Sequence, residues 1–250
     1  MTHPTPIAFA AVAVVVGGIT AGWVRAQVFI HSVDPHQAWR TTCPHCTLPL
    51  ITSHHARAWL PHARCPHCRR QIGPPTGVVE ATMILTMAAL AWTVTDPLLL
   101  ATLLVFTTTG VALVFTDLAV HRLPDRLTLP MFAVTATLLT TDVVTHHHPG
   151  AGVTALAGAV GTSGFYLLLT LTAGGGGGDV KLALSTGLML GWHGYLAIVA
   201  GLVLGFALTA IGATWRLLTG RLSRGEDIAH APGMVTATLA VALTAGYASR

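Results

Sequence analysis

The sequence has very few charged residues. Asp, Glu, Lys and Arg make up 9% of its 250 residues, whereas 52% are hydrophobic, and the mean hydropathy is +0.67. A water-soluble domain of this length needs more polar surface than this to cover its core. The composition excludes an ordinary soluble protein and predicts an all-α polytopic membrane protein.

The apolar runs indicate how many helices cross the membrane. About 20 residues span the hydrocarbon core as a helix. The runs that reach or approach this length are 7–24, 78–95, 97–116, 127–145, 151–173, 195–215 and 231–249. A shorter run, 180–192, ends in the turn formed by residues 191–194. We therefore expect about eight transmembrane helices.

Lysine and arginine are missing from one set of loops. The segments around Asp96, at 142–150 and at 192–194 contain neither. Basic residues concentrate on the cytoplasmic side, so eight spans with both termini outside place nearly all of them in the cytoplasm. These cytoplasmic residues are Arg25, Arg40, Arg57, Arg64, Arg69, Arg70, Arg122, Arg126, Lys181, Arg216, Arg221 and Arg224. Without the short span the last three would move outside, so the charges support it. The net charge of +4 then reflects topology and requires no nucleic-acid partner.

The first apolar run lacks the features of a cleaved signal peptide. No basic residue precedes it, no clear small-residue cleavage site follows it, and Arg25 comes shortly after it. This arrangement favours an uncleaved helix. We divide the chain into an N-terminal helix (1–30), a cytoplasmic segment (31–77) and a transmembrane domain (78–250).

Cysteine is absent outside the polar segment 31–77. The four cysteines lie there as two Cys-x-x-Cys pairs, Cys43/Cys46 and Cys65/Cys68, separated by eighteen residues. This spacing is typical of a four-cysteine zinc site. Disulfides are the alternative, but the reducing cytoplasm disfavours them. We predict a structural zinc ion that contributes folding energy to a segment too small for a large core.

Histidines offer other ligands, but we do not expect them to bind metal. Those near the cysteines are His45, His54, His55, His62 and His67. Four thiolates already complete a tetrahedral shell, so we interpret these histidines as polar loop residues. The external run His146–His148 is interpreted as a solvated turn rather than a metal site.

Two aspartates lie at the predicted membrane boundary. Asp117 ends the third span and Asp179 follows a glycine run at the start of the short one, so both lie at the cytoplasmic face. Two neighbouring carboxylates in a partly dehydrated site share one proton, and together they can activate water against a peptide carbonyl. The alternative is that each only stabilises a helix end. Membrane carboxylates with a partner are functional candidates, which favours the catalytic interpretation.

These residues together resemble a known family. The stretch Gly176-Gly177-Gly178-Asp179-Val180-Lys181-Leu182 matches the GxGDxKL motif of the prepilin peptidases, or type IV leader peptidases, which are GxGD intramembrane aspartyl proteases. The segment DLAVHRLPD, which starts at Asp117 and ends with Pro124-Asp125, is similar to the family's other motif. The paired cysteines and Glu80 resemble features of the longer, bacterial members.

The resemblance implies an activity, its substrates and its site. Asp117 and Asp179 correspond to the first and second catalytic aspartates, and Asp125 ranks below them, as a cap for the fourth helix. The implied partners are prepilins or pseudopilins with a basic leader and an apolar helix, together with membrane lipids. Cleavage would occur at the cytoplasmic face of the bacterial inner membrane.

The residues around Asp179 have further expected roles. Gly176 and Gly178 would let the backbone bend and a substrate strand approach. Lys181 would pair with a carboxylate or a lipid phosphate, or extend to the interface without a partner. The glycine run is not a phosphate-binding loop, because no strand precedes it and the spacing of nucleotide fingerprints is missing.

Many members of the family also methylate the new N-terminus with S-adenosylmethionine, and here the sequence departs from the pattern. The family's Asn-Val pair and Arg-x-Pro stretch are not recognisable in residues 23–40, WVRAQVFIHSVDPHQAWR. The cysteine segment also lacks a glycine-rich nucleotide loop. Methyltransferase activity therefore stays an open expectation.

Two other function classes stay open from the residues alone. Fourteen histidines and membrane carboxylates would suit a transporter or metal-handling protein, although the paired broken-helix repeats of many carriers are missing. A catalytically silent scaffold for pilus or secretion components is the other, which the intact aspartates disfavour.

Overall fold

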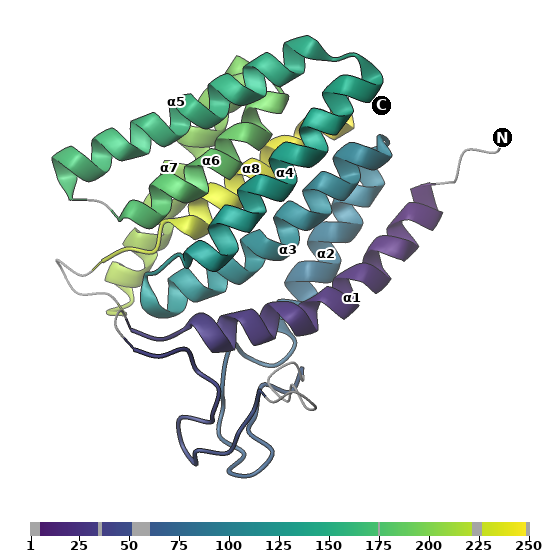
Figure 1. The fold of residues 1–250 in the computed structure, drawn as a ribbon. Coiled ribbons are helices and arrows are strands. Elements are labelled where there is room, and N and C mark those ends of the chain that lie inside the picture. Colours follow the sequence, from purple (N-terminus) through teal and green to yellow (C-terminus); the bar gives the residue numbers. More distant parts are fainter. Residues whose placement is uncertain (1–5, 35–36, 52–60, 175, 222–226, 249–250) are drawn as a thin grey trace.

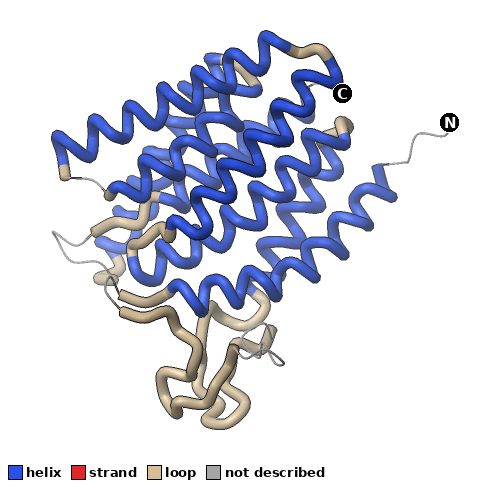
Figure 2. Tube along the Cα trace, in the orientation of Figure 1, coloured by secondary structure: helices blue, strands red, loops and turns tan. Residues whose placement is uncertain are grey.

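The computed structural model describes residues 6–34, 37–51, 61–174, 176–221 and 227–248, and apart from two isolated β-bridges the regular elements in these ranges are helices (Figures 1 and 2). The helices are α1 (Pro6–His31), α2 (Val78–Thr93), α3 (Pro97–Val120), α4 (Asp125–His146), α5 (Pro149–Ala173), α6 (Gly177–Trp192), α7 (Tyr195–Leu218) and α8 (Ala231–Ala248). Of the predicted basic and histidine residues, Arg57, Arg224, His54 and His55 lie outside the described ranges.

Successive helices run back and forth, so alternate connections meet at the same end of the bundle (Figure 1). The segment with the cysteines projects from one end, which we call the cysteine end. Residues 121–124, 174, 176, 219–221 and 227–230, from the other connections, lie there too. The opposite end holds the short connections 94–96, 147–148 and 193–194.

Most of the described helices are long and apolar enough to cross a membrane. The six that qualify are Phe9–His31 of α1, and α3, α4, α5, α7 and α8 over their full lengths. The other two, α2 and α6, have 16 residues each, or about 24 Å of helix against a hydrocarbon core of about 30 Å. α6 lies inside the bundle, with residues 185–191 all buried, and an enclosed helix need not match the lipid thickness. The predicted all-helical membrane fold is confirmed.

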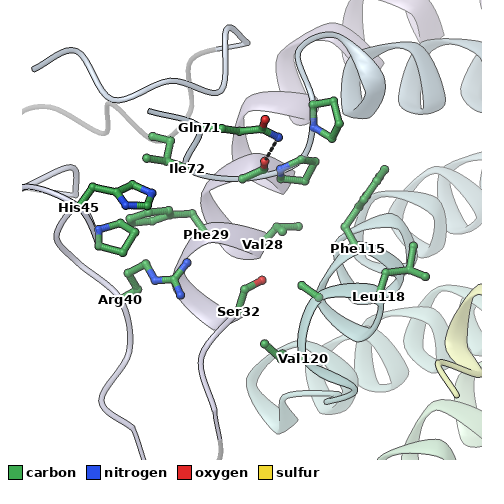
Figure 3. Close-up of a pocket in the computed structure, with 15 residues that line it drawn as sticks. Val28, Phe29, Ser32, Arg40, His45, Gln71, Ile72, Phe115, Leu118 and Val120 are labelled. Atoms are coloured by element: carbon green, nitrogen blue, oxygen red, sulfur yellow. Dashed lines mark hydrogen bonds between the residues drawn. The ribbon is translucent and has the colours of Figure 1, made fainter. Parts of the chain in front are cut away.

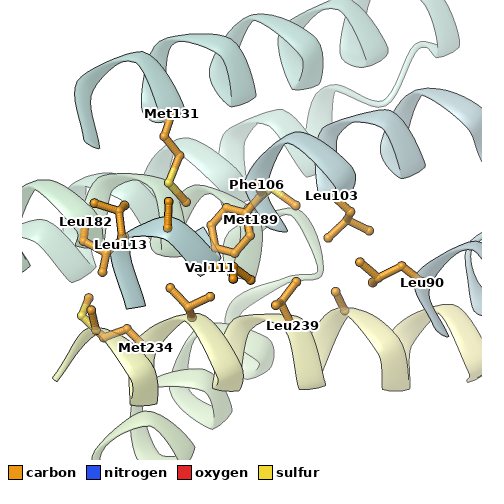
Figure 4. Packing of buried hydrophobic residues seen from close by; sticks show 14 of the residues in the cluster. Leu90, Leu103, Phe106, Val111, Leu113, Met131, Leu182, Met189, Met234 and Leu239 are labelled. Carbon is orange, nitrogen blue, oxygen red and sulfur yellow. The ribbon is translucent and has the colours of Figure 1, made fainter. Parts of the chain in front are cut away.

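The core is built around α3. Phe106 and Leu113 of α3 pack between Met131 of α4, Met189 of α6 and buried side chains of α8 (Figure 4). These side chains are fully or almost fully buried. Because α3 packs along α4 and α8, the residue at its far end is held in a fixed position relative to the starts of those two helices.

Helices α5 and α6 approach closely because glycines line their contact. A Cβ atom at Gly187 would collide with Thr162 Oγ1 and with the carbonyl oxygen of Gly158. The Thr162 hydroxyl lies 2.8 Å from the carbonyl oxygen of Ala183, which adds a hydrogen bond between the helices. This contact positions the N-terminus of α6, where Asp179 lies.

A buried ion pair joins α1 to α2 where the cysteine segment begins and ends. Arg25 is 2% exposed, and its Nη2 atom donates to Glu80 Oε2 at 2.7 Å. The same guanidinium donates to the carbonyl oxygens of Pro74 and Pro75, both at 3.0 Å. Its donors are therefore paired in a low-dielectric site. Glu80 thus has a structural partner, and its pairing anchors the segment to the bundle.

Candidate active site and cysteine cluster

The two predicted aspartates line one cavity at the cysteine end. The cavity has a volume of about 450 Å³, and its walls come from the end of α3, the start of α6 and the residues before α8. Asp117, Asp179 and His230 all contribute to its lining. The structure therefore brings together the carboxylates that the sequence separates by more than sixty residues.

Asp117 sits in the last turn of α3 and is 5% exposed. Its Oδ2 atom accepts the backbone N–H of Ala231, the first residue of α8, at 3.0 Å. The N-terminus of a helix carries unpaired N–H groups and a positive partial charge, so it stabilises a nearby carboxylate. The next residue, Pro232, has no backbone N–H to donate. The N–H of Ala231 therefore makes the hydrogen bond from the start of α8 to Asp117.

Asp179 lies in the first turn of α6 and faces the same cavity. Its N–H donates to the carbonyl oxygen of Gly176 at 3.1 Å, which closes the turn. Both carboxyl groups line the same cavity. The helix-end role considered for each aspartate therefore coexists with a paired arrangement in which two carboxyl groups can share one proton.

At two positions before Asp179 the local structure requires glycine. Gly174 has φ 76° and ends α5 in the left-handed conformation that glycine adopts without strain. A Cβ atom at Gly178 would lie 2.9 Å from Leu123 Cβ, so this glycine lets α6 pack against the chain that leads into α4. Gly176 and Gly177 face open space, and their lack of a side chain leaves the rim of the cavity clear.

Lys181 and Asp125 form an ion pair at the surface. Lys181 Nζ lies 2.6 Å from Asp125 Oδ1, and both side chains are exposed, at 40% and 56%. The carboxylate partner expected for Lys181 is thus Asp125. The prediction that Asp125 caps α4 is wrong, because Pro124 occupies the N-cap position and no side chain caps the helix. Asp125 is the first helical residue, and its carboxylate is taken up by Lys181 instead.

The sequence reasoning missed His230, which lines the cavity immediately before α8. Its Nε2 atom lies 2.7 Å from the Tyr166 hydroxyl and its Nδ1 atom 2.8 Å from Thr209 Oγ1. Thr209 Oγ1 is also 3.0 Å from the carbonyl oxygen of Gly205, which accepts its proton. The ring then donates from Nδ1 and accepts from Tyr166 at Nε2. These partners lie on α5 and α7, so no local motif indicates them.

We expect His230 to make the stability of the protein depend on pH. Burial lowers the pKa of its imidazole below the ordinary value of 6.5. Between the lowered value and 6.5 the unfolded chain binds more protons, so stability falls as pH drops below about 6.5. The thermal unfolding midpoint should therefore fall between pH 7.5 and pH 5.5, and His230→Gln should reduce that fall.

His193 is another partly buried histidine whose pKa is lowered by burial, and it contributes equally to both proteins. The difference between wild type and His230→Gln therefore isolates His230. An identical fall in both proteins would contradict the assignment.

The four cysteines form a cluster that fits a metal ion. The Sγ atoms of Cys43 and Cys68 are 3.8 Å apart, and those of Cys46 and Cys65 are 3.6 Å apart. Tetrahedral thiolates on a zinc ion at about 2.3 Å lie about 3.8 Å from one another, whereas a disulfide needs about 2.05 Å. The cysteines are free thiols, so the geometry suits a metal and not disulfides.

Both cysteine pairs sit in the same type of turn. The N–H of Thr47 donates to the carbonyl oxygen of Cys43, and that of Arg69 to Cys65, both at 2.9 Å. Thr47 and Arg69 each adopt positive φ, 57° and 58°. Phe29 of α1 packs against the buried cysteines and thereby docks the cluster on the bundle. Within the described residues, none of the neighbouring histidines belongs to the four-thiol group.

Comparison with known proteins identifies similar sequences. Residues 104–212 match the model of a family described as the type IV leader peptidase family. A protein of Aeromonas hydrophila named prepilin leader peptidase/N-methyltransferase is 32% identical over 163 residues, which cover 62% of this chain and 55% of that protein. The chain thus spans about half the length of this curated relative. No solved structure matches the chain. The family match includes both Asp117 and Asp179.

Proposed function

We propose that this chain, whose residues 104–212 match the model of the type IV leader peptidase family, is an aspartic endopeptidase that removes the basic leader of type IV prepilins or pseudopilins. The observation that carries the proposal is that Asp117 and Asp179 line one cavity at the ends of two membrane helices. Neither a transporter nor a silent scaffold is favoured by the family match.

The contacts of the two aspartates support different roles for them in the proposed reaction. The N–H of Ala231 and the N-terminus of α8 stabilise the ionised form of Asp117. Asp117 takes a proton from the attacking water while Asp179 gives its proton to the scissile carbonyl oxygen, which forms a neutral diol. In the next step the diol returns a proton to Asp179, Asp117 protonates the leaving amine, and the C–N bond breaks.

The surroundings of the cavity suit a substrate with an apolar helix. A groove of about 460 Å³ lies between α2, α3 and α8, and its lining is mainly apolar, with Leu85, Leu118 and Leu243 among the side chains. Leu118 follows Asp117 in sequence and is 46% exposed. A pilin helix in this groove would leave its leader beside the aspartates, and its lipid-facing side in the bilayer.

We place the protein in the bacterial inner membrane with its cysteine end in the cytoplasm and both termini outside. The described connections at that end contain Arg40, Arg122 and Arg221, whereas those at the opposite end contain neither lysine nor arginine. This asymmetry follows the rule that basic loops stay in the cytoplasm. It puts the aspartates on the side where a basic leader is presented.

We expect Asp117→Asn and Asp179→Asn each to reduce leader cleavage by several orders of magnitude, because each removes one of two groups that act together. Cleavage of a purified prepilin, followed by gel mobility or mass spectrometry, measures the effect. Asp125→Asn is the matched control: its exposed ion pair with Lys181 contributes about 0–1 kcal/mol, so cleavage should be largely retained. Full activity of either first variant would refute the two-aspartate mechanism.

The ion at the cysteine cluster is proposed to be zinc in a structural role, since four thiolates leave no position for a catalytic water. Protein prepared with Co²⁺ should show thiolate-to-cobalt charge-transfer absorption. Cys65→Ser should weaken that band and lower the thermal unfolding midpoint. His67→Ala changes an exposed neighbour in the same turn and should keep both. Absorption that survives Cys65→Ser unchanged would contradict the ligand assignment.

A second activity, N-methylation of the new N-terminus by S-adenosylmethionine, is supported by the name of the Aeromonas hydrophila relative. A cavity of about 500 Å³ lies between the cysteine segment and α1 and α3, with Arg40, Ser32 and Phe115 among its lining (Figure 3). Its size suits a cofactor. Among the described residues that line it none is acidic, so it offers no carboxylate to ribose hydroxyls.

Incubation of the protein with cleaved pilin and S-adenosylmethionine labelled in its methyl group tests this activity. We expect transfer of label to the pilin N-terminus, and Asp179→Asn should retain it because its lesion lies in the peptidase site. Absence of transfer to a pilin already cleaved would remove the methyltransferase from the proposal and leave the peptidase intact.

A further inference from the structure

A group of carboxylates and imidazoles lies at the opposite end of the bundle, far from the aspartate cavity. Its members are Asp96, before α3, and Asp142, His146 and His148, around the turn from α4 to α5. The sequence analysis interpreted these histidines as a solvated turn. Their side chains are partly exposed, at 44% for His146 and 58% for His148, but both face a carboxylate that is almost fully buried.

The local fold explains why these side chains converge. Asp142 and His146 are four residues apart in α4, so they share one face of the helix. His147 has φ 55° and reverses the chain after α4, which brings His148 back toward Asp142. Asp96 uses Oδ1 to accept the N–H of Leu99 at 2.7 Å, so its Oδ2 is the atom that faces the cluster.

The donor atoms of Asp96, Asp142 and His146 lie close enough to share one ion, and His148 lies beside Asp142. His146 Nδ1 lies 3.0 Å from Asp142 Oδ1 and 3.9 Å from Asp96 Oδ2, and His148 Nδ1 lies 3.7 Å from Asp142 Oδ1. The donors of Asp96, Asp142 and His146 are all within 4.8 Å of one another. Ligands on zinc at about 2.0–2.1 Å are at most about 4.2 Å apart. Binding of one ion therefore requires small rotations of the partly exposed Asp96, His146 and His148 side chains.

A cation would compensate the negative charges of the Asp96 and Asp142 carboxylates. Asp142 has a side-chain exposure of 3%, and a buried carboxylate is costly without a compensating charge. The connections at the opposite end contain no lysine or arginine in the described residues, so no basic side chain from them reaches the cluster. One protonated imidazole would balance one of the two carboxylates, whereas a divalent cation balances both.

We propose that Asp96, Asp142, His146 and His148 bind a first-row divalent metal ion such as Zn²⁺ at the end of the bundle opposite the cysteine cluster. Two imidazoles and two carboxylates form a donor set that zinc accepts in tetrahedral geometry. The ion links the start of α3 to the turn between α4 and α5. This site is independent of the peptidase proposal, since it shares no residue with the aspartate cavity.

Metal content of the full-length protein in detergent tests the site, with zinc ions alone as the probe. After equilibration with buffered Zn²⁺ and removal of unbound ion, we expect about two zinc ions per chain, one on the cysteines and one on this cluster. Asp142→Asn and His146→Gln should each reduce the content to about one. His147→Gln changes the neighbouring histidine, whose side chain is not among the donors, and should keep two.

Thermal unfolding with and without Zn²⁺ provides the second measurement, because an ion that binds only the folded state raises the thermal unfolding midpoint. With the cysteines already loaded, added Zn²⁺ should raise the midpoint of wild type and of His147→Gln, but not of His146→Gln. Should Asp142→Asn fail to fold, the exposed His146→Gln and His148→Gln still decide the outcome. One zinc ion per chain in wild type, or two in His146→Gln, would overturn the proposal.

Discussion

The hydrogen bond between Asp117 and the N-terminus of α8 is the contact on which the site depends. Ala231 needs an acceptor for its N–H, because the first turn of a helix has no partner within the helix. The carboxylate that provides it comes from the last turn of α3. The same contact stabilises a nearly buried negative charge and fixes where α8 begins. The Asp117 carboxylate thus satisfies an unpaired N–H at the start of α8 and still lines the cavity.

The second aspartate is positioned by packing rather than by capping across helices. α6 is enclosed by its neighbours, and the glycine contact with α5 sets its position. At its N-terminus Gly178 permits close approach to Leu123, and the following residue, Asp179, faces the cavity. Two carboxyl groups therefore line one cavity where α3 ends and α6 and α8 begin, at the boundary expected between lipid and water. The proposed mechanism has the two groups share one proton.

Features carried by short sequence patterns could be predicted, and features that depend on distant partners could not. Length of apolar runs indicated the helices, and the spacing of Cys43, Cys46, Cys65 and Cys68 indicated the cluster. Hydropathy placed the start of α6 at residue 180, although the helix begins at Gly177, because glycine and aspartate lower hydropathy without preventing a first helical turn.

The pairs that the sequence did not reveal join residues far apart in the chain. Arg25 with Glu80, and His230 with Tyr166, depend on which faces of different helices meet. The histidine run at the opposite end was interpreted from its neighbours in sequence alone, and the turn at His147 changes that view by bringing His148 to Asp142. Helix rotation and turn geometry decide such contacts, and neither is encoded in a local motif.

The dependence of leader cleavage on pH, measured as kcat/KM for a purified prepilin, tests the paired action of Asp117 and Asp179 most directly. A pair that works with one shared proton loses activity when both groups are protonated and again when both are ionised, so the account predicts a bell-shaped profile. A rate that rises or stays level across the whole range in which the protein is folded would contradict it.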